Sequence, residues 1–271
     1  MQQVRLGVVS FLNTTPLIEG LELTDGITLV PRVPSSLVGC LERGVVDFSL
    51  ASSVDYQRSS QDLRILQVGL LSSDGQTSTV RLCSRKPIEQ VTTVHCDTDS
   101  HTSVALLSIM MKDLFETDVS IIPTEINKLS DDPALWPESI LMIGDKVVRS
   151  QPTSLLYEYE LDLGEVWKMH TGLPFVFAMW MGNATLDMET VRFAAMTLDR
   201  QKRRNMQRLE QLVSTHATDR GWDITAALAY VDGTMQYSWS KNHEDSLQLF
   251  FERAYELGII REIRPIEFFD W

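Results

Sequence analysis

The chain is poor in cysteine, with only Cys40, Cys83 and Cys96 among 271 residues. An odd number at such wide spacing is typical neither of a disulfide framework nor of a zinc ribbon. The five histidines also lack the close helical spacing of a metal-binding pair. We therefore interpret the cysteines as reduced thiols in the core, and we expect no resident metal.

Basic residues are outnumbered, since 24 Lys and Arg stand against 37 Asp and Glu and give a formal net charge of -13. This balance opposes nucleic-acid binding, which depends on Lys and Arg that neutralise phosphates. One local cluster runs against the trend, and we interpret it as a solvated helix face. Its members are Arg200, Lys202, Arg203, Arg204 and Arg208.

Long hydrophobic runs are also missing. The most apolar stretch, residues 173–182, is interrupted by Pro174 and falls short of the roughly 18 residues that cross a bilayer. Residues 1–9 show no basic region followed by an apolar segment and a cleavage site. We therefore expect no membrane partner and a cytoplasmic location.

Phosphate-binding and nucleophile motifs are absent as well. The sequence has no G-x-x-x-x-G-K-[ST] loop, no G-x-G-x-x-G turn after a strand and no G-x-S-x-G elbow. We therefore expect the protein to use no cofactor.

What the chain does contain is 44% hydrophobic residues, enough for a large core, arranged in alternating strand and helix patterns. Such alternation is typical of α/β proteins with largely parallel sheets. The expected strands are residues 7–12, 27–30, 45–50, 80–84, 91–95, 140–143 and 175–180, and the expected helices are 34–44, 101–114 and most of the chain from about 188.

Two of these segments predict crossings between lobes. Residues 72–79 are rich in Ser, Thr and Gly and suit an outbound crossing, and residues 175–180 suit the return strand. The first lobe is then discontinuous. We expect residues 1–84 with 180–271 to form it, residues 85–179 to form the second lobe, and the helices after residue 188 to cover the sheet of the first.

Polar residues at element ends supply the candidate site. Asn13 follows the first strand, where open α/β sheets bind ligands, although an Asn there also stabilises turns. Ser100, Thr102 and Ser103 crowd a helix start, which suits ordinary capping and also a bound carboxylate. Asp145 suits a helix cap or a carboxylate facing the cleft. The local patterns leave each pair of readings open.

Two further side chains stand near the return crossing. Trp167 and His170 precede residues 175–180, and an aromatic ring in such a place more often packs than reacts. We interpret both as packing residues.

Four segments together give the chain a family resemblance. They are residues 10–17 (SFLNTTPL), 100–103 (SHTS), 143–145 (IGD) and 162–180 (DLGEVWKMHTGLPFVFAMW). The last is by far the most specific, and the order and spacing of all four match over essentially the whole chain. In these features the sequence resembles the chorismate dehydratase family. The resemblance implies a type II periplasmic-binding-protein-like fold, in which two α/β lobes joined by two crossing strands enclose a cleft.

The resemblance also implies an activity. It is the cofactor-free dehydration of chorismate to 3-[(1-carboxyvinyl)oxy]benzoate, a step of menaquinone synthesis by the futalosine pathway. Asn13 and Thr79 match the catalytic positions, with Ser78 as another source of the hydroxyl. The candidate substrate contacts are Ser10, Ser78, Ser100, Thr102, Ser103, Asp145, Thr171 and Gly172.

Two further residues bear on this set. Lys146 stands where the family carries a small residue, which leaves the role of Asp145 open. Arg81 is a further candidate for supplying positive field to an acidic substrate.

Two other functions compete. The related 1,4-dihydroxy-6-naphthoate synthase shares the Thr-Gly-Leu-Pro element at residues 171–174, but residues 175–178 follow the dehydratase pattern and no histidine lies between Gly144 and Trp167. A non-catalytic protein that binds a small carboxylate would share the architecture and be exported. An oligomer is compatible with the sequence, but nothing indicates one.

Overall fold

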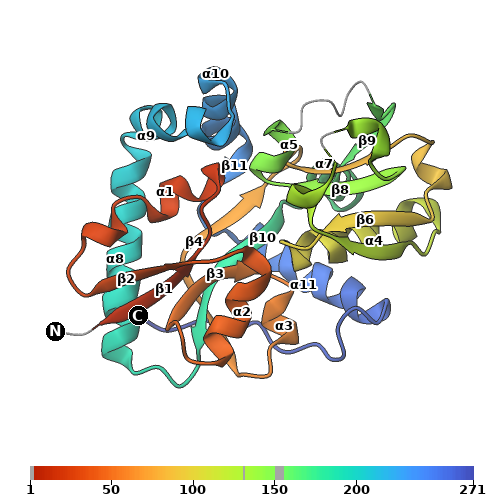
Figure 1. Cartoon of the computed structure of the whole chain (residues 1–271). Coiled ribbons are helices and arrows are strands. Elements are labelled where there is room, and N and C mark those ends of the chain that lie inside the picture. The colour runs from red at the N-terminus through yellow and green to blue at the C-terminus, as the bar shows by residue number, and fades with distance from the viewer. Residues whose placement is uncertain (1–2, 131, 150–155) are drawn as a thin grey trace.

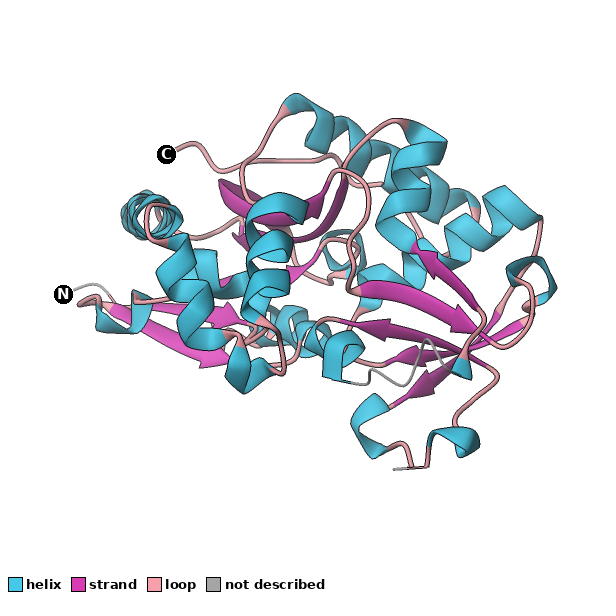
Figure 2. Ribbon diagram, turned by 90° about the horizontal axis from the view of Figure 1, so that it is seen from above, coloured by secondary structure: helices cyan, strands magenta, loops and turns pink. Residues whose placement is uncertain are grey.

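The strands of the protein form two separate sheets. The computed structural model describes residues 3–130, 132–149 and 156–271, and the two groups of strands lie side by side in Figures 1 and 2. The first sheet has the order β11 (Met235–Gln236), β4 (Leu63–Ser73), β10 (Phe175–Asn183), β3 (Phe48–Ser52), β1 (Val4–Val8) and β2 (Ile27–Pro31). The second has the order β7 (Ser120–Thr124), β6 (Thr93–Asp97), β8 (Ser139–Ile143), β5 (Val80–Ser84) and β9 (Tyr159–Asp162).

Both sheets mix parallel and antiparallel pairs. Strand β1 runs parallel to β2 and β3, and β6 runs parallel to β7 and β8. Strand β10 is antiparallel to β3 and β4, and β5 is antiparallel to β8 and β9. All five residues of β3 and of β8 are buried, as the short apolar runs in these strands predict for the interior of a covered sheet.

The chain passes between the sheets twice. The first passage is the loop between Ser73 of β4 and Val80 of β5, which confirms the outbound crossing expected at residues 72–79. The second follows helix α7 (Leu163–Thr171), where Gly172 takes a left-handed conformation with φ of 74° before β10 begins at Phe175. The whole of β10 belongs to the first sheet.

Helices cover the faces of both sheets (Figure 1). Helix α2 packs on β1 and β3, while α8 packs on β4 and on α1. Besides α7, the helices are α1 (Thr15–Ile18), α2 (Pro34–Glu42), α3 (Asp55–Arg58), α4 (His101–Phe115), α5 (Asp145–Arg149), α8 (Met188–Met206), α9 (Leu209–His216), α10 (Ile224–Leu228) and α11 (Lys241–Glu256). Within the described residues, no helix combines the length and apolar character needed to span a membrane.

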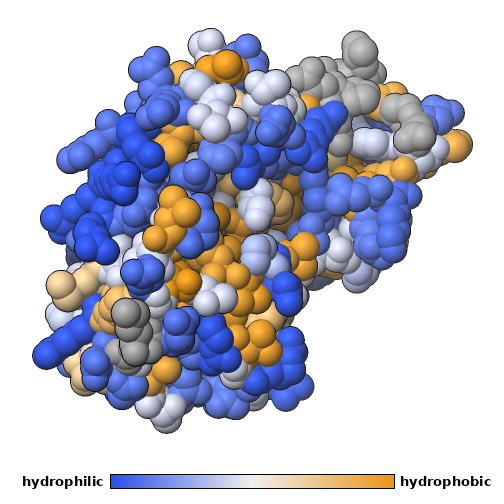
Figure 3. Space-filling view, turned by 60° about the vertical axis from the view of Figure 1, so that its left-hand side comes forward, coloured by the Kyte–Doolittle hydropathy of each residue, from blue (hydrophilic) through white to orange (hydrophobic). Residues whose placement is uncertain are grey.

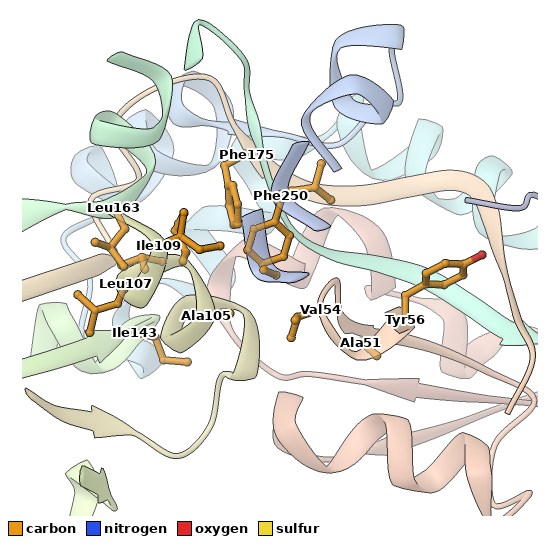
Figure 4. Packing of buried hydrophobic residues seen from close by; sticks show 14 of the residues in the cluster. Ala51, Val54, Tyr56, Ala105, Leu107, Ile109, Ile143, Leu163, Phe175 and Phe250 are labelled. Carbon is orange, nitrogen blue, oxygen red and sulfur yellow. The ribbon is translucent and has the colours of Figure 1, made fainter. Parts of the chain in front are cut away.

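Helix α11 covers the first sheet, as expected of the late helices, and also reaches the second half of the molecule. It packs against β10 and also against α4 of the second sheet. Its Phe250 ring lies 5.0 Å from the ring of Phe175, and its Ser246 accepts a hydrogen bond of 3.1 Å from the Trp167 indole. Figure 4 shows Phe250 between side chains of the two halves, with Ile109 on one side and Val54 on the other. One hydrophobic core therefore runs across both sheets.

Several boundaries differ from the sequence prediction. The first strand covers Val4–Val8 and not residues 7–12, because residues 12–14 form a turn of 3-10 helix. Strand β7 was not predicted, since its pattern is mostly exposed and gives no apolar run. The three cysteines are free and buried, and burial raises the pKa of Cys83 and of Cys96 to about 12.

Candidate functional site

A cavity lies where the two sheets meet. It holds about 590 Å³ of empty space, part of it open to solvent. Figure 3 shows hydrophobic side chains gathered toward the middle of one face, between largely hydrophilic margins. The cavity is lined by Val9, Phe11, Asn13, Thr14, Pro34, Leu50, Ser52, Leu71, Thr77, Thr79, Val80, Ser100, Ser103, Ile143, Gly144, Phe177, Ala178, Tyr230 and Met235.

The lining is apolar with a few neutral polar groups. Among the described residues that line it there is no Asp, Glu, Lys, Arg or His. Its polar side chains are hydroxyls and one amide, which hydrogen-bond a ligand without adding formal charge.

Asn13 lies in the 3-10 turn that follows β1. The turn is held by Thr14, whose hydroxyl lies 2.7 Å from the carbonyl oxygen of Val9 and 2.8 Å from that of Phe11. The Asn13 amide Nδ2 donates to the Tyr230 hydroxyl at 3.0 Å. Its carbonyl oxygen Oδ1 is buried and has no hydrogen-bond partner. An unpaired buried acceptor is costly, so a ligand O–H would stabilise this side chain.

Thr79, which directly precedes β5 of the second sheet, also contacts the Tyr230 hydroxyl. Its hydroxyl lies 2.8 Å from the Tyr230 oxygen. Tyr230 is buried in a turn of π-helix, residues 229–234, a conformation frequent at functional sites. Burial raises the pKa of Tyr230 well above the usual range of a phenol, so the side chain remains a neutral hydroxyl.

Sequence reasoning missed Tyr230. It lies 217 residues from Asn13 and 151 from Thr79, and no motif surrounds it. Only the fold brings the three polar groups together. The one local signal in the sequence is that Tyr230 is a polar side chain in an otherwise apolar helical segment.

Asp162 holds the backbone of the segment that contains Ser78 and Thr79. The Asp162 carboxylate accepts from the backbone N–H groups of Thr77 at 2.9 Å and Ser78 at 2.7 Å, and also from the Thr77 hydroxyl. Ser78 thereby adopts a left-handed conformation with φ of 61°. The structure places Thr79, and not Ser78, at the cavity wall.

Ser100 and Ser103 line the cavity at the start of α4. Ser100 caps the helix, because its hydroxyl accepts from the Ser103 N–H at 3.2 Å, and it donates to the Ser103 hydroxyl at 2.9 Å. Thr102 lies elsewhere: its hydroxyl is 3.3 Å from both the Ser53 hydroxyl and the Val54 nitrogen. Thr102 thus fastens α4 to the turn after β3, while the two serines face the cavity.

Asp145 does not line the cavity. Its carboxylate accepts from the Leu12 N–H at 3.2 Å and from the Trp222 indole at 2.8 Å. Burial raises its pKa, and the Trp222 hydrogen bond opposes the shift. Lys146 is paired with Asp97, whose carboxylate lies 2.8 Å from the ammonium group. The Lys146 side chain is therefore held outside the cavity by ion pairing.

Three further candidates lie away from the cavity because they serve element ends. Ser10 is exposed. The Thr171 hydroxyl donates to the Trp167 carbonyl at 2.8 Å and accepts from the Leu173 N–H, and Gly172 ends helix α7. Of the other residues considered, Arg81 is paired with Glu160 at 3.0 Å, and Trp167 is fully buried as a packing residue.

Two sheets joined by two crossings, with a cavity between them, define a protein of the periplasmic-binding-protein-like fold. A structure from Archaeoglobus fulgidus matches with a TM-score of 0.75 at 14% identity, covering 95% of this chain and 98% of that one. The periplasmic aliphatic sulphonate binding protein of Escherichia coli matches with a TM-score of 0.66 at 13% identity, covering 100% and 94%. At such identities the likeness shows the fold alone.

The sequence comparisons define the family. The model of the menaquinone biosynthesis family matches residues 4–256, and the chain belongs to this family. It is also 28% identical over 195 residues to the chorismate dehydratase of Thermus thermophilus, which is 66% of this chain and 70% of that protein.

Proposed function

We propose that this protein converts chorismate into 3-[(1-carboxyvinyl)oxy]benzoate and water, in menaquinone synthesis by the futalosine pathway. Membership of the menaquinone biosynthesis family and the similarity to a chorismate dehydratase support this assignment. The observation that carries it is that one cavity joins Asn13, Thr79, Ser100 and Ser103 from three distant parts of the chain. These are residues for which the family resemblance implied a site.

The reaction needs orientation and control of charge. One ring proton and the ring hydroxyl leave as water, and the cyclohexadiene becomes aromatic, so no electrons enter or leave the substrate. We propose that the departing hydroxyl donates to the unpaired Oδ1 of Asn13, while Thr79, which accepts from the Tyr230 hydroxyl in this arrangement, donates toward the departing oxygen as charge develops there. Donors placed in advance of the reaction stabilise developing charge most strongly in a site that excludes water.

A carboxylate of the substrate is assigned to the start of α4. Ser100 and Ser103 offer hydroxyls there, and the first N–H groups of a 15-residue helix carry partial positive charge. This local field attracts an acid despite the net charge of -13, because net charge governs the approach of a ligand more than its binding inside a cleft.

We assign the removal of the ring proton to a carboxylate of the substrate itself. No carboxylate, amine or imidazole is found among the described residues of the lining, and Tyr230 is held neutral by burial. A carboxylate of chorismate is the remaining base within reach of its own ring. This mechanism uses no metal and no cofactor.

The two sheets define the lobes in this proposal. We propose that the strands of each sheet belong to one lobe, that the two lobes close on the substrate, and that the return crossing lies at residues 172–174, just before β10. The expected bounds, residues 1–84 with 180–271 and residues 85–179, therefore shift to the two passages, because β5 lies in the second sheet and the whole of β10 in the first. A cytoplasmic location belongs to the same assignment, since three free buried thiols suit a reducing compartment.

Incubation of the purified protein with chorismate, followed by chromatography, tests the activity. The proposal predicts enolpyruvyl-oxybenzoate from the parent protein and from Asn127→Ala, an exposed asparagine in the 3-10 turn at residues 126–128. Asn13→Ala is expected to lower kcat by about a hundredfold, as the loss of one polar group that contacts the transition state does.

Other outcomes identify the competing functions. Binding of chorismate without any product would indicate a binding protein, and parental turnover by Asn13→Ala would remove Asn13 from the mechanism. A folded protein that neither binds chorismate nor converts it would contradict the proposed function as a whole.

A further inference from the structure

We propose that Asp145 is a positioning residue that holds the two sides of the site together. In this account, one carboxylate fixes the turn that carries Asn13 and, through Trp222, the phenol of Tyr230. The inference deepens the proposed function and rests on it for its kinetic test, but not for its structural test.

Asp145 lies where the second sheet comes close to the first. It begins α5 directly after β8, and Gly144 before it has a left-handed φ of 62°. A Cβ atom at Gly144 would lie 3.3 Å from the Phe11 ring, and the Gly144 N–H donates to the Thr79 carbonyl at 2.8 Å. The end of β8 therefore contacts both the turn that contains Asn13 and the segment that contains Thr79, just before β5.

The first arm of the contact reaches Asn13. The Leu12 N–H donates to Asp145 Oδ2 at 3.2 Å across 133 residues of sequence. Leu12 opens the 3-10 turn, where a backbone N–H has no partner within the turn. Asp145 supplies that partner, and the next residue in the turn is Asn13.

The second arm reaches Tyr230. The Trp222 indole N–H donates to Asp145 Oδ1 at 2.8 Å, and the indole stacks on the Tyr230 ring with centroids 4.8 Å apart and planes 10° apart. The Tyr230 hydroxyl then meets Asn13 and Thr79. The two arms close a ring of contacts that begins and ends at Asp145.

A carboxylate suits this position because it has two acceptor oxygens and no hydrogen. Asp145 is only 7% exposed, so an unpaired N–H left beside it would find little water. An asparagine of the same shape offers one acceptor, and its amide hydrogens would face one of the two donors.

Neighbouring cations support the ionised carboxylate. The Arg220 side chain lies 4.0 Å from Asp145. Burial raises the Asp145 pKa, and the charges of Arg220 and Arg149 oppose that rise. Arg149 also donates to the carbonyls of Asp219 and Arg220, each at 3.0 Å. Helix α5 therefore docks on the segment that leads to Trp222.

Hydrogen exchange of the ligand-free protein tests the structural part. Asp145→Asn is expected to lower amide protection at residues 9–16 and at residues 222–234 together. The matched control Asp187→Asn exchanges the carboxylate that caps α8 for an amide that also caps well, and it is expected to leave the protection of both segments at the parental level. Parental protection of both segments in Asp145→Asn would overturn the proposal.

Kinetics test whether the same contacts serve the reaction. Asp145→Asn is expected to lower kcat on the order of a hundredfold, as small misplacements of reacting groups do, while Asp187→Asn keeps the parental rate. Trp222→Phe keeps an aromatic ring against Tyr230 and loses only the N–H donor, and a roughly tenfold fall is expected. Because both substitutions break one chain of contacts, the double variant should be within about twofold of Asp145→Asn alone.

The outcomes separate the two proposals. The positioning role would be overturned if the effects of the two substitutions on kcat were independent and multiplied in the double variant. It would also be overturned if Trp222→Phe had the parental kcat and unchanged hydrogen exchange at residues 9–16. Trp222→Phe also gives the decisive result if Asp145→Asn fails to fold. If the parent protein does not turn over chorismate, the proposed function fails, while the exchange pattern still tests Asp145.

Discussion

The amide nitrogen of Asn13 lies 3.0 Å from the phenol oxygen of Tyr230, although 217 residues separate them in the sequence. This contact orients the Asn13 side chain, because the nitrogen is occupied and the carbonyl oxygen is left without a partner. A side chain held in this way accepts a hydrogen bond. In the proposed reaction it therefore meets the substrate hydroxyl and not a carboxylate.

Thr79 is predicted to act through its hydroxyl. Thr79→Val keeps the shape and loses the oxygen that meets Tyr230, so we expect kcat to fall by roughly a hundredfold. Thr79→Ser restores the hydroxyl and should retain at least about a tenth of the parental kcat. Steady-state kinetics with chorismate give both values, and equal rates for the Val and Ser variants would contradict the role. Thr215→Val, at an exposed threonine of α9, is the matched control.

Ser100 and Ser103 are predicted to govern substrate affinity. The double replacement Ser100→Ala with Ser103→Ala removes two hydroxyls from the cavity wall, and KM should rise by about tenfold, as expected for the loss of hydrogen bonds to a charged group. The expected kcat stays within about threefold, because these groups hold a part of the substrate that does not react. Ser108→Ala on the same helix, where the hydroxyl bonds only the Val104 carbonyl, should leave KM unchanged. A fall in kcat with constant KM would place the serines at the reacting atoms instead.

Tyr230 is predicted to stay protonated through pH 10. Burial disfavours the phenolate and raises the pKa above the ordinary value of 10.0. The folded parent and Tyr230→Phe should therefore show the same rise in phenolate absorbance up to pH 10 and differ only above it. In urea-unfolded samples the two proteins should already differ near pH 10.

The same shift has a consequence for stability. Above pH 10 the unfolded chain releases a proton that the native Tyr230 keeps, so this residue lowers the free energy of unfolding as pH rises. The decline runs from pH 10 toward the raised native pKa. An absorbance difference between the folded proteins below pH 10 would contradict both expectations.

Asp162 is predicted to be important for stability as well as for the position of Thr79. Its carboxylate accepts from the N–H groups of Thr77, Ser78 and Gly164. Asp162→Asn should lower the free energy of unfolding by about 2–4 kcal/mol, since buried donors lose a charged acceptor. Asp223→Asn, which caps α10 through one N–H, should cost about 1 kcal/mol or less. Urea unfolding measures both, and equal losses would show that Asp162 is an ordinary cap.

Much of the fold follows from local sequence patterns. Strands β5 and β8 appear as short apolar runs, and α4 appears as a serine cap followed by apolar residues, because burial imposes these patterns locally. Strand β7 is largely exposed and leaves no such trace. The reach of α11 to both sheets depends on the relative placement of distant elements, which a local pattern does not encode.

The site was predictable only in part, for the same reason. Asn13, Ser100 and Ser103 carry local signals, since each follows a strand or opens a helix. Tyr230 and the two donors of Asp145 come together only through contacts across more than 70 residues. Asp145 itself was visible as a polar residue after a strand, but its burial against Trp222 was not.

A crystal structure of the Asn13→Ala variant with chorismate tests the central claim most directly. The account predicts chorismate in the cavity between the two sheets, with its ring hydroxyl near residue 13 and Thr79 and a carboxylate at the start of α4. Chorismate bound anywhere else on the protein, or in this cavity with a carboxylate at residue 13, would contradict it.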